Sequence, residues 1–335
     1  MKAIEIQTLN SKEIKLVSKT IPETSVDEVL IKGLAAALNH RDEYIREGLY
    51  PGIKNGVTLG SDLCGIVVEA KKDNSLINKR VIVNPNRQWG KSEKVQSKDF
   101  HIMGLPQDGA LAEYCKVPAD KIFPAPEFLT DEECAALPLA GLTAYRALFY
   151  HGKAEKGQKV LITGIGGGVA QFVCQFAIAQ GCEVYITSSS KEKAEKMLKL
   201  GATEYFNYKE EDWHKELLKK TDGGVDLIID SAGGEQMNKY IKAAKPGGKI
   251  VFYGASAGKT DKFDLHSAFW KQLTIQGSTM GSDKEFEKML DFVNKHEIHP
   301  IIDSESYNLE NAIKAFDKMK SGKQFGKLVI NLKEN

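Results

Sequence analysis

The feature that most constrains the fold is a glycine-rich turn between an apolar run and an amphipathic stretch, within residues 159–191. The apolar run at 160–162 is typical of a buried parallel strand, and the residues after the turn place apolar side chains at helical spacing before a second strand-like run at 184–187. Such a βαβ unit predicts a dinucleotide site, because glycines let the backbone approach a pyrophosphate and the helix N-terminus offers it free N–H groups. The candidate contacts are Gly164, Gly166, Gly167, Gly168 and Val169. A turn without a ligand is the alternative, but each glycine costs roughly 0.5–1 kcal/mol where regular structure was possible, and a simple turn has no need of four.

Strand and helix patterns alternate from residue 159 onward, whereas residues 1–125 contain short β-branched runs separated by two long irregular segments, 39–59 and 84–110. The alternation predicts an α/β fold with a doubly wound, parallel, six-stranded Rossmann sheet. The expected strands are 159–163, 183–187, 203–206, 225–230, 248–253 and 273–277, and the expected helices are 141–150, 168–180, 191–200, 210–219 and 235–244. Thr130 and Glu133 have the spacing of a capping box that opens an earlier helix. A final strand at 327–332 lacks the crossover needed to join that sheet, so it is expected to return to the N-terminal part. The expected domains are therefore 126–279 for the cofactor and 1–125 with 280–335 for the substrate.

Composition excludes several classes of protein. A length of 335 residues exceeds what one core usually supports. A formal net charge of +1 gives no bulk attraction to nucleic acid or to an anionic membrane. The sequence contains no run of 18 apolar residues, so no membrane span is predicted. Five scattered cysteines, with no paired spacing, favour reduced thiols in a cytoplasmic protein that lacks a secretory leader.

Several motifs together resemble the medium-chain dehydrogenase/reductase superfamily along nearly the whole chain. They are N-x-x-D-x-Y-x-R-x-G-x-Y-P at 39–51, LGSDLCG at 59–65, DGALAEY at 108–114, LPLAGLTAY at 137–145 and the glycine turn. Within the superfamily the chain is most similar to the zinc-free quinone oxidoreductase branch, which includes zeta-crystallin-like proteins. The loop at 84–90 suggests a subgroup called zinc-type alcohol dehydrogenase-like. The resemblance implies a GroES-like, β-rich catalytic domain beside the Rossmann domain, and a homodimer formed through the edge strand at 273–277.

The resemblance also bears on metal. In zinc-dependent members of the superfamily two cysteines and a histidine hold the catalytic zinc, and the matching positions here are Asn39, Ser61 and a site near Leu139. None of these is a usual zinc ligand, so we expect no metal. Without a metal, donors must stabilise developing negative charge, which suits quinones and α,β-unsaturated carbonyls better than simple alcohols.

The segment 39–51 supplies the candidate catalytic residues. Tyr50, Tyr44 and Asn39 are candidate hydrogen-bond or proton donors on the loop that the family places beside the nicotinamide, and Asp42 is expected to orient this loop. The two tyrosines have packing as their alternative role, and Asp42 has the capping of a turn.

The end of the second Rossmann strand indicates which nicotinamide cofactor binds. NAD enzymes place an Asp or Glu about 20 residues after the first glycine, but here the strand ends in Thr187 and three serines. Ser188 and Ser189, together with Lys191 and Lys193, are suited to a 2′-phosphate, and the resemblance selects Lys193 of the two lysines and adds Tyr208. We therefore expect NADPH. A solvated helix face is the alternative explanation of the lysines.

Further cofactor contacts are expected where other strands end. Thr143 is expected at the nicotinamide carboxamide or ribose. The remaining candidates follow the fifth and sixth strands and are Gly254, Ala255, Ser256 and Ser278. Lys327 is a weaker candidate for a cofactor phosphate.

These patterns predict an NADPH-dependent oxidoreductase that transfers hydride to a quinone or enone without zinc. Two alternatives stay open. One is a zinc-dependent alcohol dehydrogenase, and the other is a non-catalytic NADPH-binding protein with a redox-sensing or RNA-associated role.

Overall fold

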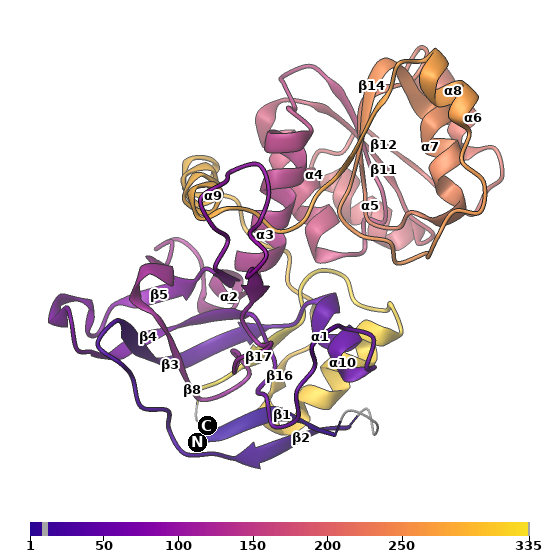
Figure 1. Cartoon of the computed structure of the whole chain (residues 1–335). Helices are drawn as coiled ribbons and strands as arrows, with labels where there is room; N and C mark the ends of the chain where they lie inside the picture. Colours follow the sequence, from indigo (N-terminus) through magenta and orange to yellow (C-terminus); the bar gives the residue numbers. More distant parts are fainter. Residues whose placement is uncertain (9–12, 334–335) are drawn as a thin grey trace. The chain divides into compact units, whose positions relative to one another are not determined.

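The protein is described by a computed structural model that covers residues 1–8 and 13–333 (Figure 1). The chain divides into two compact units, which are described separately. Unit 1 contains Met1–Ala140 and Ser282–Asn335, and unit 2 contains Gly141–Gly281. Among the described residues, no helix has the length and apolar character needed to cross a membrane.

Unit 2 is built on a six-stranded sheet in which every pair of neighbours is parallel. Its strands, in spatial order, are β12 (Glu204–Phe206), β11 (Glu183–Thr187), β10 (Lys159–Ile162), β13 (Val225–Asp230), β14 (Ala244–Phe252) and β15 (Thr274–Gly277). In order of appearance along the chain this is 3-2-1-4-5-6, the strand order of dinucleotide-binding sheets. The predicted Rossmann sheet is confirmed.

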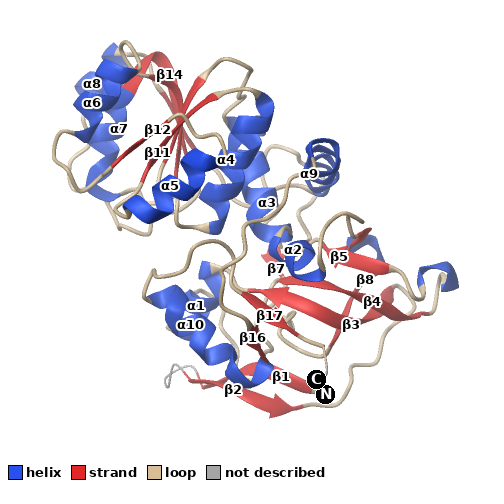
Figure 2. Cartoon of the chain, turned by 180° about the vertical axis from the view of Figure 1, so that it is seen from behind, coloured by secondary structure: helices blue, strands red, loops and turns tan. Residues whose placement is uncertain are grey.

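Helices cover both faces of this sheet. Figure 2 shows α4 (Gly168–Gln180) and α5 (Lys191–Lys199) on one face, with α6 (Trp213–Lys220), α7 (Met237–Ala243) and α8 (Leu265–Trp270) on the other. The inner strands β10, β11 and β13 are buried on both faces, which explains their nearly continuous apolar sequence, whereas the edge strand β15 is partly exposed. Most predicted bounds agree with these to within three residues. β14 begins earlier than expected, at Ala244, which pairs with Val225 across a register shift.

Unit 1 contains a seven-stranded, mostly antiparallel sheet and a pair of N-terminal strands. The sheet contains β16 (Tyr307–Asn308), β17 (Val329–Asn331), β3 (Glu28–Ala37), β4 (Asp62–Ala70), β5 (Arg80–Val83), β9 (Ile122–Pro124) and β8 (Tyr114–Pro118). Smaller pairs are formed by β1 (Lys2–Thr8) with β2 (Glu13–Ser18), and by β6 (Asn86–Arg87) with β7 (His101–Ile102). β17 pairs antiparallel with β3, so the last strand returns to the N-terminal part as predicted.

The helices of unit 1 lie around this sheet. They are α1 (His40–Arg46), α2 (Asp131–Ala136), α9 (Asp283–His296) and α10 (Ala312–Lys320). Thr130 and Glu133 form the expected capping box at the start of α2, which packs against β3, β4 and β17. For this reason the contacts place α2 with unit 1, whereas the sequence boundary at 125/126 placed it with the Rossmann domain. The segment 39–59, expected to be irregular, begins with α1.

The connection from α2 into unit 2 is helical. α3 (Pro138–Tyr145) spans the boundary between the units and continues as a π-helix over Arg146–His151. The sequence predicted an ordinary helix over 141–150. The first residue after this segment, Gly152, donates its N–H to the Ala147 carbonyl, five residues back, as expected of a π-helical turn.

Candidate active site

Unit 1 holds a buried polar cluster, the Asn39 cluster, made of Asn39, Asp42, Ser61, Asp62 and Lys327. Asn39 precedes α1, and its backbone N–H donates to Asp42 Oδ2 at 2.8 Å, which closes a capping box at the helix start. The Asn39 amide donates to Ser61 Oγ at 3.2 Å and to Asp62 Oδ2 at 2.9 Å. Both amide hydrogens are therefore used inside the protein, and Asn39 orients its neighbours rather than offering a free donor.

Lys327 lies two residues before β17, and all three hydrogens of its ammonium group are donated within this cluster. Nζ donates to the Leu38 carbonyl at 2.8 Å, to Asn39 Oδ1 at 2.6 Å and to Asp62 Oδ2 at 2.9 Å. The side chains of Lys327 and Asp62 are 4% and 0% exposed. A buried ion pair is stable only when hydrogen bonds offset the desolvation of both charges, and here they do. Lys327 thus has no hydrogen left for a cofactor phosphate, contrary to our weaker expectation.

Asp42 is fully buried at the edge of the cluster. Burial raises the pKa of its carboxyl, while the charge of Arg41 and the hydrogen bond from the Asn39 N–H oppose that rise. Its position agrees with the expected orienting role, since it fixes the start of the helix that carries Tyr44.

The two tyrosines lie on and after α1. Tyr44 is half-buried within the helix, and Tyr50 is half-buried where its ring packs against the core of unit 1. The Arg41 guanidinium carbon lies 5.1 Å from the centre of the Tyr50 ring, and Arg41 Nη1 donates to the Met103 carbonyl at 2.8 Å. Arg41 thereby joins the two segments, 39–59 and 84–110, that the sequence left irregular.

In unit 2 the glycine turn adopts the conformation that its sequence predicts. Gly164 follows β10 with φ of +65°, a left-handed conformation that side chains disfavour. Gly167 is the N-cap of α4, and Gly168 and Val169 are its first residues. A Cβ on Gly166 would lie 3.3 Å from Lys193 Nζ. The turn therefore keeps backbone N–H groups, the positive end of the α4 dipole and a lysine ammonium together, which fits a dinucleotide phosphate.

The end of β11 brings most of the predicted phosphate-binding residues together. Tyr208 donates its hydroxyl to Ser189 Oγ at 3.1 Å, and Lys193 lies over the glycine turn. Ser190 caps α5 by accepting from the Lys193 N–H. Ser188 is buried, and its Oγ bonds to the backbone of Ser190, so this hydroxyl shapes the turn instead of facing a ligand.

The other predicted contacts follow neighbouring strands. Gly254 comes after β14, and a Cβ there would lie 2.7 Å from the Ser231 carbonyl oxygen, so this position needs glycine. Ala255 is exposed, and Ser256 donates its N–H and its hydroxyl to the same carbonyl. Ser278 follows β15, and its buried hydroxyl has no hydrogen-bond partner among the described residues. Thr143 is buried and donates to Met280 Sδ at 3.8 Å, two residues beyond Ser278.

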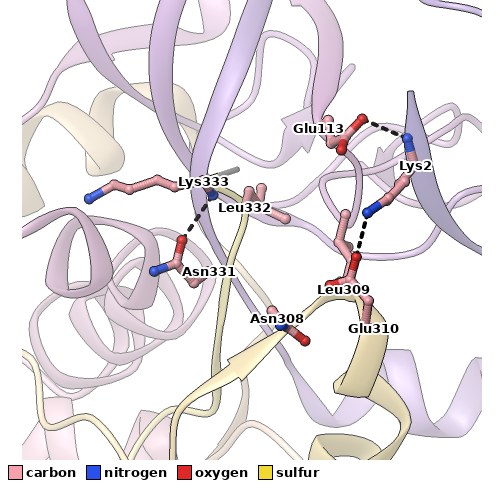
Figure 3. A pocket seen from close by; sticks show the side chains of 8 residues that line it. All are labelled: Lys2, Glu113, Asn308, Leu309, Glu310, Asn331, Leu332 and Lys333. Carbon is pink, nitrogen blue, oxygen red and sulfur yellow. Dashed lines mark hydrogen bonds and ion pairs between the residues drawn. The ribbon is translucent and has the colours of Figure 1, made fainter. Parts of the chain in front are cut away.

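A cavity of ≈ 500 Å³ lies elsewhere in unit 1 (Figure 3). It is lined by Lys2, Glu113, Asn308, Leu309, Glu310, Asn331, Leu332 and Lys333. Lys2 pairs with Glu310 at 2.6 Å and donates its backbone N–H to Glu113. The cavity contains none of the predicted site residues, and we assign it no catalytic role.

Comparison with known proteins identifies the family. The chain matches the models "Alcohol dehydrogenase GroES-like domain" over residues 25–127 and "Zinc-binding dehydrogenase" over residues 168–295. It is 38% identical to the zinc-type alcohol dehydrogenase-like protein YogA of Leptosphaeria maculans, over 96% of this chain and 94% of that protein. The chain belongs to the medium-chain dehydrogenase/reductase superfamily. It is also 30% identical to the quinone oxidoreductase of Mus musculus, over 99% of this chain and 98% of that protein. A crystal structure of an NAD-dependent alcohol dehydrogenase matches with a TM-score of 0.93 and 31% identity, covering 99% of both chains.

This medium-chain dehydrogenase/reductase does not offer zinc ligands at the positions that the sequence comparison equated with them. Asn39 and Ser61 do come together, and the Leu139 N–H donates to Asp62 Oδ1 at 2.9 Å, so all three positions meet at Asp62. The groups at these positions are an amide, a hydroxyl and a backbone N–H, and the Lys327 ammonium donates to Asn39 Oδ1 and to Asp62 Oδ2. No three His, Cys, Asp or Glu residues within 1–8 and 13–333 are grouped to hold a metal ion. The residues present do not fit zinc, because none of these three groups is a usual zinc ligand and the positive charge of the Lys327 side chain repels a metal cation.

Several residues that shape these sites escaped the sequence analysis. Asp230 ends β13, accepts from the Thr163 hydroxyl, and accepts the N–H groups of Ala232 and Gly233, which fixes the turn beside the glycine loop. A carboxylate followed by small residues at a strand end is a readable signal for such a turn. The sequence around Arg41 contains no comparable pattern that would have predicted its contacts.

Proposed function

We propose that this protein is an NADPH-dependent oxidoreductase that reduces a quinone or an α,β-unsaturated carbonyl without catalytic zinc. The observation that carries the proposal is the Lys327 ammonium inside the Asn39 cluster, where the zinc-dependent members have metal ligands. The names of the relatives leave the substrate open, since they include a quinone oxidoreductase and alcohol dehydrogenases. A cytoplasmic location is part of the proposal and is supported by five free cysteines.

The nicotinamide, when bound, supplies the hydride, and the protein has to hold the substrate and supply a proton. Reduction of an enone adds the hydride to the β-carbon and a proton to the product, and reduction of a quinone likewise needs one hydride and one proton. Tyr50 is the proposed proton donor, with Tyr44 as the alternative on the same segment. Asn39 and Asp42 are positioning residues, because their polar atoms are engaged with each other and with neighbouring groups.

Steady-state oxidation of NADPH with a panel of quinones, alkenals and enones tests the proposal. Turnover of these acceptors by protein that contains far less than one zinc per chain is the expected result. One tightly held zinc per chain with alcohol oxidation would favour the zinc-dependent alternative. Tight NADPH binding without turnover of any acceptor would favour the non-catalytic alternative.

Lys193→Glu is expected to weaken NADPH binding by roughly tenfold to a hundredfold, because it replaces a cation at the phosphate with an anion. NADH binding should change much less, since NADH lacks the 2′-phosphate. Fluorescence titration of both cofactors measures this. Lys191→Glu is the matched control, because Lys191 lies on the same helix but is exposed and pairs with Glu195. Tighter binding of NADH than NADPH by the unmodified protein would contradict the cofactor assignment.

A homodimer through one face of unit 2 is the last part of the proposal. β15 is the terminal strand of its sheet, and beside it four large apolar side chains are exposed: Phe263, Leu265, Phe269 and Trp270. Trp270 is 74% exposed and Leu265 is 70% exposed, which is unusual for a monomer surface. An unpaired edge can pair with the same edge of a second copy across a twofold axis.

Trp270→Glu is expected to convert the dimer to a monomer, because it places a charge in a surface that the dimer would bury. Light scattering coupled to size-exclusion chromatography measures the mass. Ile313→Glu is the control, since Ile313 is an exposed apolar residue on α10 of unit 1. A monomeric mass for the unmodified protein would refute the dimer.

A further inference from the structure

Arg41 has a buried guanidinium group whose hydrogen-bonding capacity is only partly used. The side chain is 7% exposed, and Nη1 donates to the Met103 carbonyl. Nε and Nη2 are buried and have no hydrogen-bond partner among the described residues. Buried polar atoms in folded proteins are nearly always paired, and an unpaired donor on a charged group is costly. These two nitrogens are therefore short of an acceptor.

The position in α1 does not by itself favour an arginine, although the side chain contacts Met103 and Tyr50 and forms an ion pair with Asp42. Arg41 is the second residue of the helix, where the helix dipole favours anions over cations. Asp42 Oδ1 lies 3.7 Å from Nη1, beyond hydrogen-bond distance, and has no hydrogen-bond partner itself. Arg46 in the last turn of α1 shows the contrast, because it bonds to both Glu43 and Asp317. A cation at the start of a helix, with buried hydrogen-bond donors left unpaired, departs from local sequence preferences, and such residues are candidates for a functional role.

The contacts of Arg41 connect it to the proposed chemistry. Its guanidinium lies against the ring of Tyr50, and its one hydrogen bond is to Met103 in the segment 84–110. It thus contacts Tyr50 in the segment 39–59 and Met103 in the segment 84–110. The guanidinium carbon lies 5.1 Å from the centre of the ring that carries the proposed proton donor.

We propose that Arg41 determines substrate specificity by binding two adjacent oxygen atoms of the substrate through Nε and Nη2. This proposal rests on the proposed function and names the class of substrate that the same site would take. Nε and Nη2 lie on one edge of the planar guanidinium, and that edge matches a pair of neighbouring oxygens in a bidentate arrangement. An unsaturated ketone that carries a carboxylate presents such a pair, and so does an ortho-quinone.

Isothermal titration calorimetry on the protein loaded with NADP⁺ tests the proposal without turnover, since NADP⁺ carries no hydride. The two ligands are 4-oxo-2-pentenoate and 3-penten-2-one, which differ only in a carboxylate in place of a methyl group. The acid is expected to bind roughly tenfold to a hundredfold more tightly. A parallel pair, 9,10-phenanthrenequinone and 1,4-naphthoquinone, distinguishes adjacent carbonyls from opposed ones.

Variants assign any preference to Arg41. Arg41→Lys keeps the charge but loses the planar fork, so most of the preference for paired oxygens should disappear while binding of 3-penten-2-one stays unchanged. Arg46→Lys is the matched control on the same helix and should keep the full preference. The comparison of ligands on the unmodified protein needs no variant, so the absence of a preference there overturns the proposal even if Arg41→Lys fails to fold.

The outcomes separate this proposal from the proposed function. If neither paired-oxygen ligand binds more tightly than its partner, or if Arg41→Lys weakens all ligands equally, Arg41 has only a structural role and the proposal is overturned. Turnover of the neutral enone with NADPH in that case leaves the proposed function standing. An Arg41-dependent preference in binding, without any NADPH oxidation, supports Arg41 and removes the proposed function instead.

Discussion

Replacing Lys327 with methionine is expected to lower the free energy of unfolding by about 3–5 kcal/mol, because it leaves the Asp62 carboxylate buried without its charge partner. Lys327 Nζ donates three hydrogen bonds, and the side chains of Lys327 and Asp62 are both almost fully buried. Methionine fills a similar volume, so the loss reflects the missing charge and hydrogen bonds more than a cavity. Asn39 Oδ1 also loses the hydrogen bond that it accepts from Lys327, which loosens the start of α1.

Two comparisons isolate this effect in urea unfolding followed by circular dichroism. Lys2→Met removes an ion pair with Glu310 of similar length, 2.6 Å, but both side chains are about half exposed, so we expect a change within about 1 kcal/mol. The double variant Lys327→Met with Asp62→Leu removes both buried charges and should recover much of the stability. A loss at Lys327 no larger than at Lys2 would show that the buried pair contributes little.

The contacts of Lys327 are an example of what could not be predicted from the sequence. Its partner Asp62 is 265 residues away in the chain, and its other side-chain partner, Asn39, is 288 residues away. No periodicity or local motif connects residues at such a separation. The resemblance equated Asn39 and Ser61 with metal-ligand positions of the zinc-dependent members, but it did not predict that Lys327 would bond to Asn39.

The Rossmann unit was more readable because its signals are local. The inner strands β10, β11 and β13 are short apolar runs buried on both faces, and the turn after β10 needs the left-handed φ that glycine permits. The bounds of α4, β11 and β13 agree with the predicted 168–180, 183–187 and 225–230. α8 was missed, because its six residues expose apolar side chains instead of burying a regular stripe.

α1 is the more informative failure. Asn39 followed three residues later by Asp42 is a capping pattern of the same kind as Thr130 with Glu133, which was recognised. The helix has only seven residues and carries buried charged side chains, so it lacks the apolar stripe that usually accompanies a cap. Sequence alone therefore named candidate residues in this segment but left their geometry undefined.

Tyr50→Phe is expected to lower turnover by roughly 10²–10⁴-fold, the usual contribution of a positioned proton donor, with little change in NADPH affinity. The substitution removes one hydroxyl and keeps the ring that packs on the core of unit 1 and on Arg41. The fold of unit 1 and the stack with Arg41 should therefore survive, and the glycine turn that would hold the cofactor belongs to unit 2. Loss of rate without loss of cofactor binding separates proton donation from a structural role.

Single-turnover kinetics with pre-bound NADPH measures this chemical step directly, and a cofactor titration on the same protein measures affinity. Tyr114→Phe on β8 serves as the control for loss of a tyrosine hydroxyl elsewhere in unit 1. Tyr44→Phe, made in parallel, decides between the two candidates, because only the true donor should slow the reaction by the full factor. An unchanged rate in Tyr50→Phe together with a slow Tyr44→Phe would move the proton donor from the loop to α1, and the role of Tyr50 would then be to pack against Arg41.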